Sequence, residues 1–77
     1  MLLIGNKMED RYTIKIFWSV LDNTFIADVE ELQGCSAFGD TREEALKEVR
    51  TAMGLWLESA REHGDEIPEP IFSKILA

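Results

Sequence analysis

The side chains best suited to chemistry in this sequence are three aspartates, one histidine and one cysteine, at Asp22, Asp28, Asp40, His63 and Cys35. Clustered carboxylates can hold two metal ions for hydrolysis. These aspartates fall on three different predicted elements, however, and Asp22 and Asp40 are already explained by a turn and a helix start. His63 suits the carboxyl end of a helix, and Cys35 has no histidine nearby in the sequence to activate it. We therefore expect no enzyme activity, no metal site and no cofactor.

The chain has 77 residues, of which fifteen are acidic and eight are basic, so its net charge is −7. This length makes one domain with a small core. The single cysteine rules out an internal disulfide, which leaves oligomerisation as a common way to stabilise so short a chain. The negative charge repels nucleic acid and anionic membranes and attracts basic proteins. It also serves simply to keep a small protein soluble.

The sequence predicts a cytoplasmic protein without membrane contact. No segment approaches the roughly 20 apolar residues that a spanning helix needs. The first residues lack the basic region and the long apolar stretch of a signal peptide. Residues 1–10 show no clear period and are expected to form a loosely attached arm, while residues 11–77 form the single domain.

Two alternating segments predict an antiparallel β-hairpin. Residues 12–20 and 25–29 each place apolar side chains at every second position. The polar residues between them suit a turn, because Asp and Asn tolerate left-handed backbone. Phe17 and Ile26 are apolar on the opposite side, away from the predicted helix. That side therefore needs a cover, from a partner, a second subunit or the carboxy-terminal segment.

A short strand at residues 35–38 leads into the only long helix. Thr41 and Glu44 have the spacing of a capping box. In this motif the Thr41 hydroxyl accepts from a backbone N–H of the first turn, and the Glu44 carboxylate accepts from the backbone N–H of Thr41. Asp40 is the alternative amino-terminal cap. Gly39 suits a tight turn or a close approach of two backbone segments.

The helix is predicted from Arg42 to His63, because its apolar residues recur every three or four positions. Gly54 sits in its middle at a cost of roughly 1 kcal/mol relative to alanine. That glycine suits a close approach either to the sheet or to a second subunit. Leu55 lies off the apolar stripe and is expected to be exposed in a monomer.

The segment after the helix cannot continue it, because Pro68 and Pro70 favour extended backbone before them. Residues 71–77 are expected to form either an edge strand or a short helix. The order of elements predicts an α+β fold: a three-stranded antiparallel sheet with one long helix packed on one face, plus a short C-terminal strand or helix.

Seven short segments, taken in order, resemble the amino-terminal domain of HicB antitoxins. They are YTIKI at 12–16, FIADV at 25–29, ELQGC at 31–35, GDTREEA at 39–45, LWL at 55–57, HG at 63–64 and IPEP at 67–70. The resemblance spans about residues 11–70, without the DNA-binding domain that HicB proteins usually append. It implies a degenerate ribonuclease-H-like domain that occludes HicA, a small basic mRNA-cleaving toxin, and that forms homodimers or larger oligomers.

Two hypotheses about function follow. The first is a protein-binding, antitoxin-like domain that neutralises a HicA-like toxin, and the alternative is a solitary homo-oligomeric domain with a structural or regulatory role. Direct nucleic-acid binding is not expected, since no basic stripe is present. For partner binding we single out Asp28, Glu30 and Glu31, and for an oligomer interface Phe17, Ile26, Leu55, Ile71 and Phe72.

Overall fold

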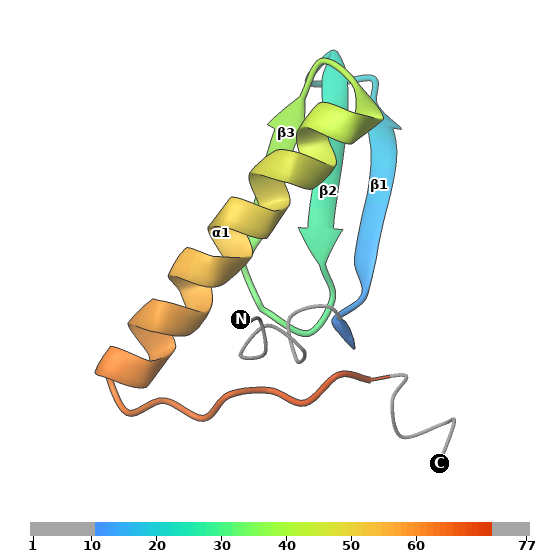
Figure 1. The fold of residues 1–77 in the computed structure, drawn as a ribbon. Coiled ribbons are helices and arrows are strands. Elements are labelled where there is room, and N and C mark those ends of the chain that lie inside the picture. Colours follow the sequence, from blue (N-terminus) through green and yellow to red (C-terminus); the bar gives the residue numbers. More distant parts are fainter. Residues whose placement is uncertain (1–10, 72–77) are drawn as a thin grey trace, which may run out of the picture.

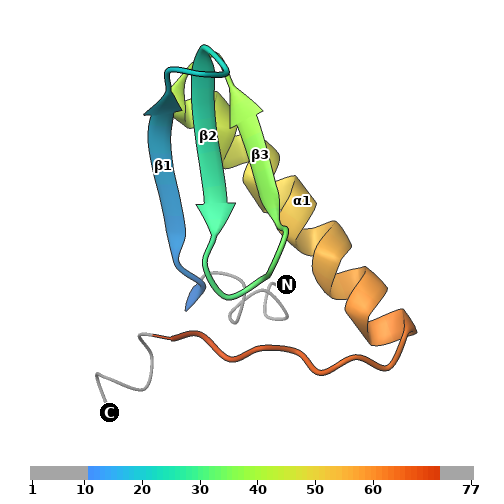
Figure 2. The same ribbon diagram turned by 180° about the vertical axis from the view of Figure 1, so that it is seen from behind.

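The computed structural model describes residues 11–71, which form three strands and one helix. Strands β1 (Ile14–Ser19), β2 (Thr24–Val29) and β3 (Ser36–Gly39) pair antiparallel in the order β1-β2-β3. Helix α1 (Arg42–Glu62) covers one face of this sheet (Figure 1) and leaves the other face open (Figure 2). The predicted α+β fold is thus confirmed. The predicted arm at 1–10 and most of the predicted element at 71–77 lie outside the described residues.

The β1–β2 hairpin turns through Asn23, whose φ of 55° is left-handed, as the sequence indicated for this turn. The hydroxyl of Ser19 accepts from the backbone N–H of Asp22 and donates to its carboxylate, at 3.1 Å in both cases. These local bonds hold the tip of the hairpin. Pairing then sets Phe17 opposite Ile26.

Strand β1 is shorter than the predicted range of 12–20, whereas β2 begins one residue earlier than predicted and β3 is shifted by one residue. Tyr12 lies two residues before β1, and its ring is buried in the core. Cys35 likewise precedes β3 and is buried, and the strand extends to Gly39 instead.

Where β3 passes into α1, the two backbones come very close. A side chain on Gly39 would place its Cβ 2.6 Å from the backbone nitrogen of Ala45. Thr41 is the amino-terminal cap, and its hydroxyl accepts from the N–H of Glu44 at 3.1 Å. The carboxylate of Glu44 accepts from the N–H of Asp40 at 2.7 Å, not from Thr41. The cap is therefore Thr41, and the return bond reaches one residue further back than the standard capping box.

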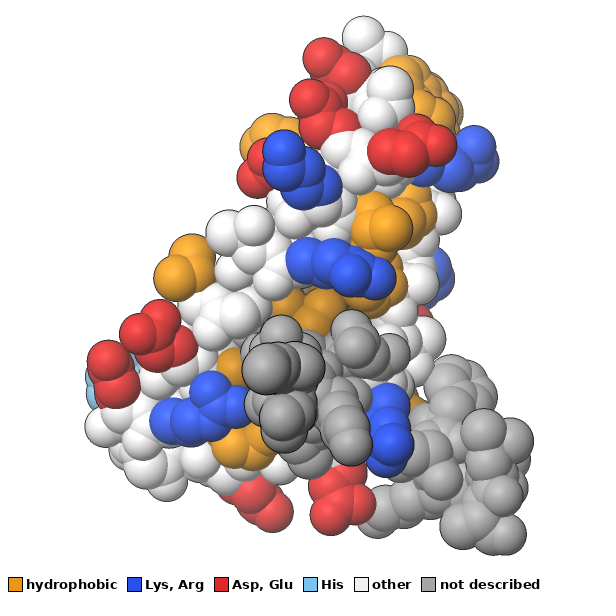
Figure 3. Space-filling view, viewed as in Figure 1, with side chains coloured by type: hydrophobic (Ala, Val, Ile, Leu, Met, Phe, Trp, Pro, Cys, Tyr) orange, Lys and Arg blue, Asp and Glu red, His pale blue; other side chains and the backbone are white. Residues whose placement is uncertain are grey.

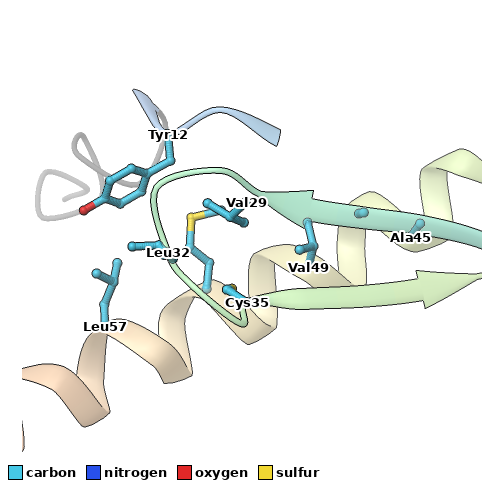
Figure 4. Close-up of a cluster of buried hydrophobic side chains, with 9 residues drawn as sticks. Tyr12, Val29, Leu32, Cys35, Ala45, Val49 and Leu57 are labelled. Carbon is cyan, nitrogen blue, oxygen red and sulfur yellow. The ribbon is translucent and has the colours of Figure 1, made fainter. Parts of the chain in front are cut away.

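The core lies between α1 and the sheet (Figure 4). The helix buries one stripe, namely Ala45, Val49, Met53, Leu57 and Ala60, as the three-and-four spacing predicted. The strands and loops contribute Tyr12, Ala27, Val29, Leu32 and Cys35. Trp56 is only partly buried beside this core, and its indole N–H donates to the carbonyl of Gln33 at 3.0 Å. That bond ties the β2–β3 loop to the helix.

Gly54 has no close neighbour within the described chain. A Cβ at this position would meet nothing within 4 Å. A close approach to the sheet therefore does not explain this glycine, and only the suggested contact with a second subunit stays a prediction.

After α1, the chain returns beneath the sheet toward the start of β1 (Figure 1). Gly64 takes a left-handed φ of 73°, which ends the helix. The hydroxyl of Tyr12 donates to the carbonyl of Pro68, Ile67 packs on the core and Pro70 is buried. The predicted extended segment, residues 65–71, is called the strap below, and it is thus anchored to the domain at several points.

Candidate protein-binding surface

The face of the sheet opposite the helix carries an apolar row across all three strands. The pairing register aligns Phe17 of β1 with Ile26 of β2, and Ile26 with Phe38 of β3. Phe17 is 38% exposed and Phe38 is 70% exposed. No described element covers this side of the sheet, as Figure 2 shows for residues 11–71. The prediction that apolar residues face away from the helix is therefore confirmed in geometry.

The row beside it is charged. Lys15 pairs with Asp28, which pairs with Ser36, so these three side chains lie next to the apolar row on the same face. Lys15 also forms an exposed ion pair of 3.3 Å with Glu30. Such an ion pair contributes little to stability because water screens it. Glu30 is exposed and Asp28 is half-buried on this face.

Glu31 points elsewhere. One carboxylate oxygen accepts from the N–H of Thr13 at 2.9 Å, and the other accepts from the Thr13 hydroxyl at 3.1 Å and from the N–H of Ile71 at 2.8 Å. Burial raises the pKa of Glu31, but these hydrogen bonds outweigh it and hold the pKa below its ordinary value. This carboxylate joins three parts of the chain. Its predicted contact with a partner stays a prediction, in competition with these bonds.

The other predicted interface residues do not join the apolar row. Leu55 is 62% exposed on α1, which covers the opposite face of the sheet. Ile71 is 47% exposed at the end of the strap. Phe72 lies outside the described residues. The structure therefore separates the predicted oligomer interface into at least two surfaces.

The three candidate aspartates lie on separate elements. Asp22 lies in the hairpin turn, Asp28 on the outer face of β2, and Asp40 just before α1. Within residues 11–71, no three His, Cys, Asp or Glu side chains gather in a way that suits a metal ion. Burial, and then the negative charge of Asp28, raise the pKa of the Cys35 thiol. A neutral buried thiol packs as a small apolar core residue.

Sequence reasoning missed Phe38 as a surface residue. The short strand around it has no clear alternation, so its side could not be assigned. No local signal could have assigned it, because the side of Phe38 follows from the register of β3 with β2. The placement of Val20 on the buried side of the first strand is wrong, because the strand ends at Ser19 and Val20 lies in the turn, 83% exposed. Leu21, beside it in the predicted turn, is 96% exposed.

Together, the fold and the open face define a small α+β domain of β-β-β-α order, with one face of its sheet covered and the other free. Over 53 residues the chain is 36% identical to the UPF0150 protein ssl0259 of Synechocystis sp., covering 69% of this chain and 73% of that protein. Over 58 residues it is 33% identical to the UPF0150 protein Ta0767 of Thermoplasma acidophilum, covering 75% of this chain and 83% of that protein. The chain belongs to the UPF0150 family.

No protein-family model matches the chain, and no solved structure matches it. Among the described residues, no helix is long and apolar enough to cross a membrane.

Proposed function

We propose that this chain is a non-catalytic, protein-binding domain of the antitoxin type, which neutralises a small basic HicA-type mRNA-cleaving toxin by covering its surface. The observation that carries this proposal is the outer sheet face, where the uncovered apolar row lies beside Asp28. An exposed apolar patch bordered by charged side chains is typical of a protein-contact surface.

Two further features support a basic partner. The net charge of −7 attracts a basic protein and speeds its encounter. The segments that resemble HicB antitoxins span most of the described chain, and HicA toxins are small and basic. The identities to UPF0150 proteins give the family of the chain and do not conflict with this proposal.

A second candidate function is a solitary homo-oligomeric domain with a structural or regulatory role. The same uncovered apolar row favours it, because a second copy of the chain is another way to remove that row from water. The two functions differ in whether a basic partner is needed, and an experiment can separate them.

The test is co-expression of the chain with a small basic reading frame encoded next to its gene, followed by affinity capture and mass determination. We expect a stable complex that suppresses the toxicity of the basic protein. Asp28→Lys should weaken capture about tenfold, whereas Glu58→Lys, the same charge change on the solvent side of α1, should not. The absence of a complex would instead favour the homo-oligomeric domain.

A further inference from the structure

Strand β3 leaves one row of backbone groups without a neighbouring strand among the described residues, since the sheet order is β1-β2-β3. The N–H of Val29 donates to the carbonyl of Cys35 at 3.0 Å. In an antiparallel pair, hydrogen-bonded positions alternate. Ala37 and Gly39 therefore also bond to β2, while the N–H and C=O groups of Ser36 and Phe38 point outward to the free edge.

Apart from its short length of four residues, this edge lacks the usual protection within the described chain. Natural edge strands avoid pairing with other chains by carrying charged residues, proline or a bulge. The sequence of β3, Ser36–Gly39, contains neither charge nor proline, and its pairing with β2 is regular. Ser36 and Phe38 are both exposed. The edge is therefore open to an added strand.

Helix α1 turns this edge into a groove, because it leans out beyond β3 (Figure 2). Two adjoining hollows of about 540 and 580 Å³ follow the line between β3 and α1, and they share Ser36, Ala52 and Leu55 as lining residues. The floor is thus a strand edge, and the wall is a helix with the exposed side chain of Leu55.

The groove is acidic. The described residues that line it include Asp40, Glu44, Glu48 and Asp65, and none of them is lysine or arginine. Figure 3, which views the molecule from the helix side, shows acidic side chains near both ends of α1, with lysine and arginine side chains between them. An occupant with positive charge would therefore be favoured over a neutral or acidic one.

We propose that this groove accepts an extended basic segment of a partner protein as a fourth strand, paired with β3 through the outward backbone groups of Ser36 and Phe38. Alternate side chains of such a strand point to opposite faces. One set faces α1 and the carboxylates of the groove. The other set extends the outer face beside Phe38, where apolar side chains continue the row. This is strand addition at a sheet edge, and it rests on the proposed function only in taking the partner to be basic.

A second copy of this chain suits the edge less well. A two-fold axis through Ala37 would pair Ser36 of each copy with Phe38 of the other. The same axis would bring the two α1 helices side by side, with Glu44 and Glu48 of both copies facing one groove. Like charges at close range oppose that arrangement, and the combined charge of −14, twice the −7 of one chain, adds to the repulsion.

The probe is a blocked seven-residue peptide in which lysine alternates with valine, titrated into the isotopically labelled full chain while backbone amide signals are followed by NMR. We expect saturable binding, with the largest shifts at Ser36 and Phe38. Ser36→Pro removes one outward N–H without touching the bonds to β2, and should weaken binding about tenfold. The matched variant Ser36→Ala should bind like the wild type.

Two further comparisons keep the test independent of folding. If Ser36→Pro does not fold, the same peptide with methyl groups on alternate backbone nitrogens should bind the wild-type chain about tenfold more weakly. Glu48→Lys, which adds a positive charge to the groove, should weaken binding of the lysine peptide, whereas Glu58→Lys should not. A peptide with glutamate in place of lysine should fail to bind.

Absence of saturable binding, equal binding of the glutamate peptide, or equal binding by folded Ser36→Pro would overturn the inference. So would a dimer that Ser36→Pro converts to a monomer, since the edge would then belong to a second copy. A captured basic protein that Ser36→Pro holds as tightly as the wild type would overturn this inference but not the proposed function. Peptide binding at the edge with no basic protein captured would contradict the proposed function alone.

Discussion

Glu31 shows how one side chain can hold together parts of the chain that are far apart in sequence. Its carboxylate accepts from Thr13 at the start of β1 and from Ile71 at the end of the strap. Hydrogen bonds to a charged carboxylate are stronger than neutral ones. Glu31 therefore anchors the return of the chain after α1, in addition to any contact with a partner.

Because the folded state lowers the pKa of Glu31, its contribution to stability depends on pH. The contribution is complete above the pKa of the unfolded chain, near 4.5, and is lost as the pH falls through the lower pKa of the folded chain. We expect Glu31→Gln to be less stable than the wild type by about 1 kcal/mol at pH 7. This difference should shrink as the pH falls from about 5 through the lowered pKa of the folded chain, as the wild-type carboxylate is protonated.

The measurement is urea unfolding followed by circular dichroism at several pH values. Glu30→Gln is the control, because Glu30 forms only an exposed ion pair with Lys15 and should change stability little at any pH. Parallel pH curves for Glu31→Gln and the wild type would show that the three hydrogen bonds of Glu31 do not favour its charged form.

Among the elements, the junction between β3 and α1 sets the position of the helix on the sheet. Gly39 brings the end of the strand against the first turn of α1, and Thr41 then caps that turn. The buried stripe from Ala45 to Ala60 faces the sheet as a consequence. A small displacement at this junction would therefore shift every helix contact with the core.

Gly39→Ala should destabilise the domain by about 1–3 kcal/mol, because its methyl group would lie 2.6 Å from the backbone nitrogen of Ala45 and 2.9 Å from the carbonyl carbon of Glu44. These are backbone atoms, which cannot move without moving the helix. Gly54→Ala, the matched change inside α1, meets no atom within 4 Å and should stabilise by up to about 1 kcal/mol.

Thermal and urea unfolding of both glycine variants provide the comparison. A Gly39→Ala protein as stable as the wild type would mean that the junction has room to relax. Loss of stability in Gly54→Ala would point to a contact between this glycine and a second subunit, as suggested above.

At the scale of the whole molecule, the domain places most of its apolar side chains between helix and sheet but leaves a second apolar row outside. Phe17, Ile26 and Phe38 form this row, and the free edge of β3 lies beside its last member. The outer face and the acidic groove thus meet at Phe38. One partner that adds a strand to β3 would contact both surfaces.

Phe17→Asp places a charge at the β1 end of the apolar row and should disrupt any assembly that buries it, because an unpaired buried charge is costly. If the wild-type chain self-associates through this face, we expect the variant to be a smaller species, with the helical circular dichroism signal retained. Analytical ultracentrifugation measures the change in mass. Val20→Asp, in the exposed hairpin turn, is the control and should leave the mass unchanged. An unaltered mass for Phe17→Asp would exclude the outer face as a self-association surface.

The local patterns of the chain were sufficient to predict the hairpin, the helix and its buried stripe. Alternation over residues 14–19 and three-and-four spacing over residues 45–60 report directly which side of an element avoids water. The turn at Asn23 was equally readable, and the start of the helix was readable to within one residue, with Thr41 or Asp40 as its cap, since each feature depends on side chains within a few residues. The sequence also sufficed to suggest that Phe17 and Ile26 lie on the side away from the helix.

The tertiary structure alone decided the rest, because it depends on pairing between distant segments. Phe38 joins Phe17 and Ile26 only through the register of β3 with β2. Glu31 bonds the strap only because the chain returns after α1 and places Ile71 beside it. The acidic groove exists because α1 crosses the sheet at an angle that carries it beyond β3. No local period encodes that angle, since it follows from how the whole helix packs on the sheet.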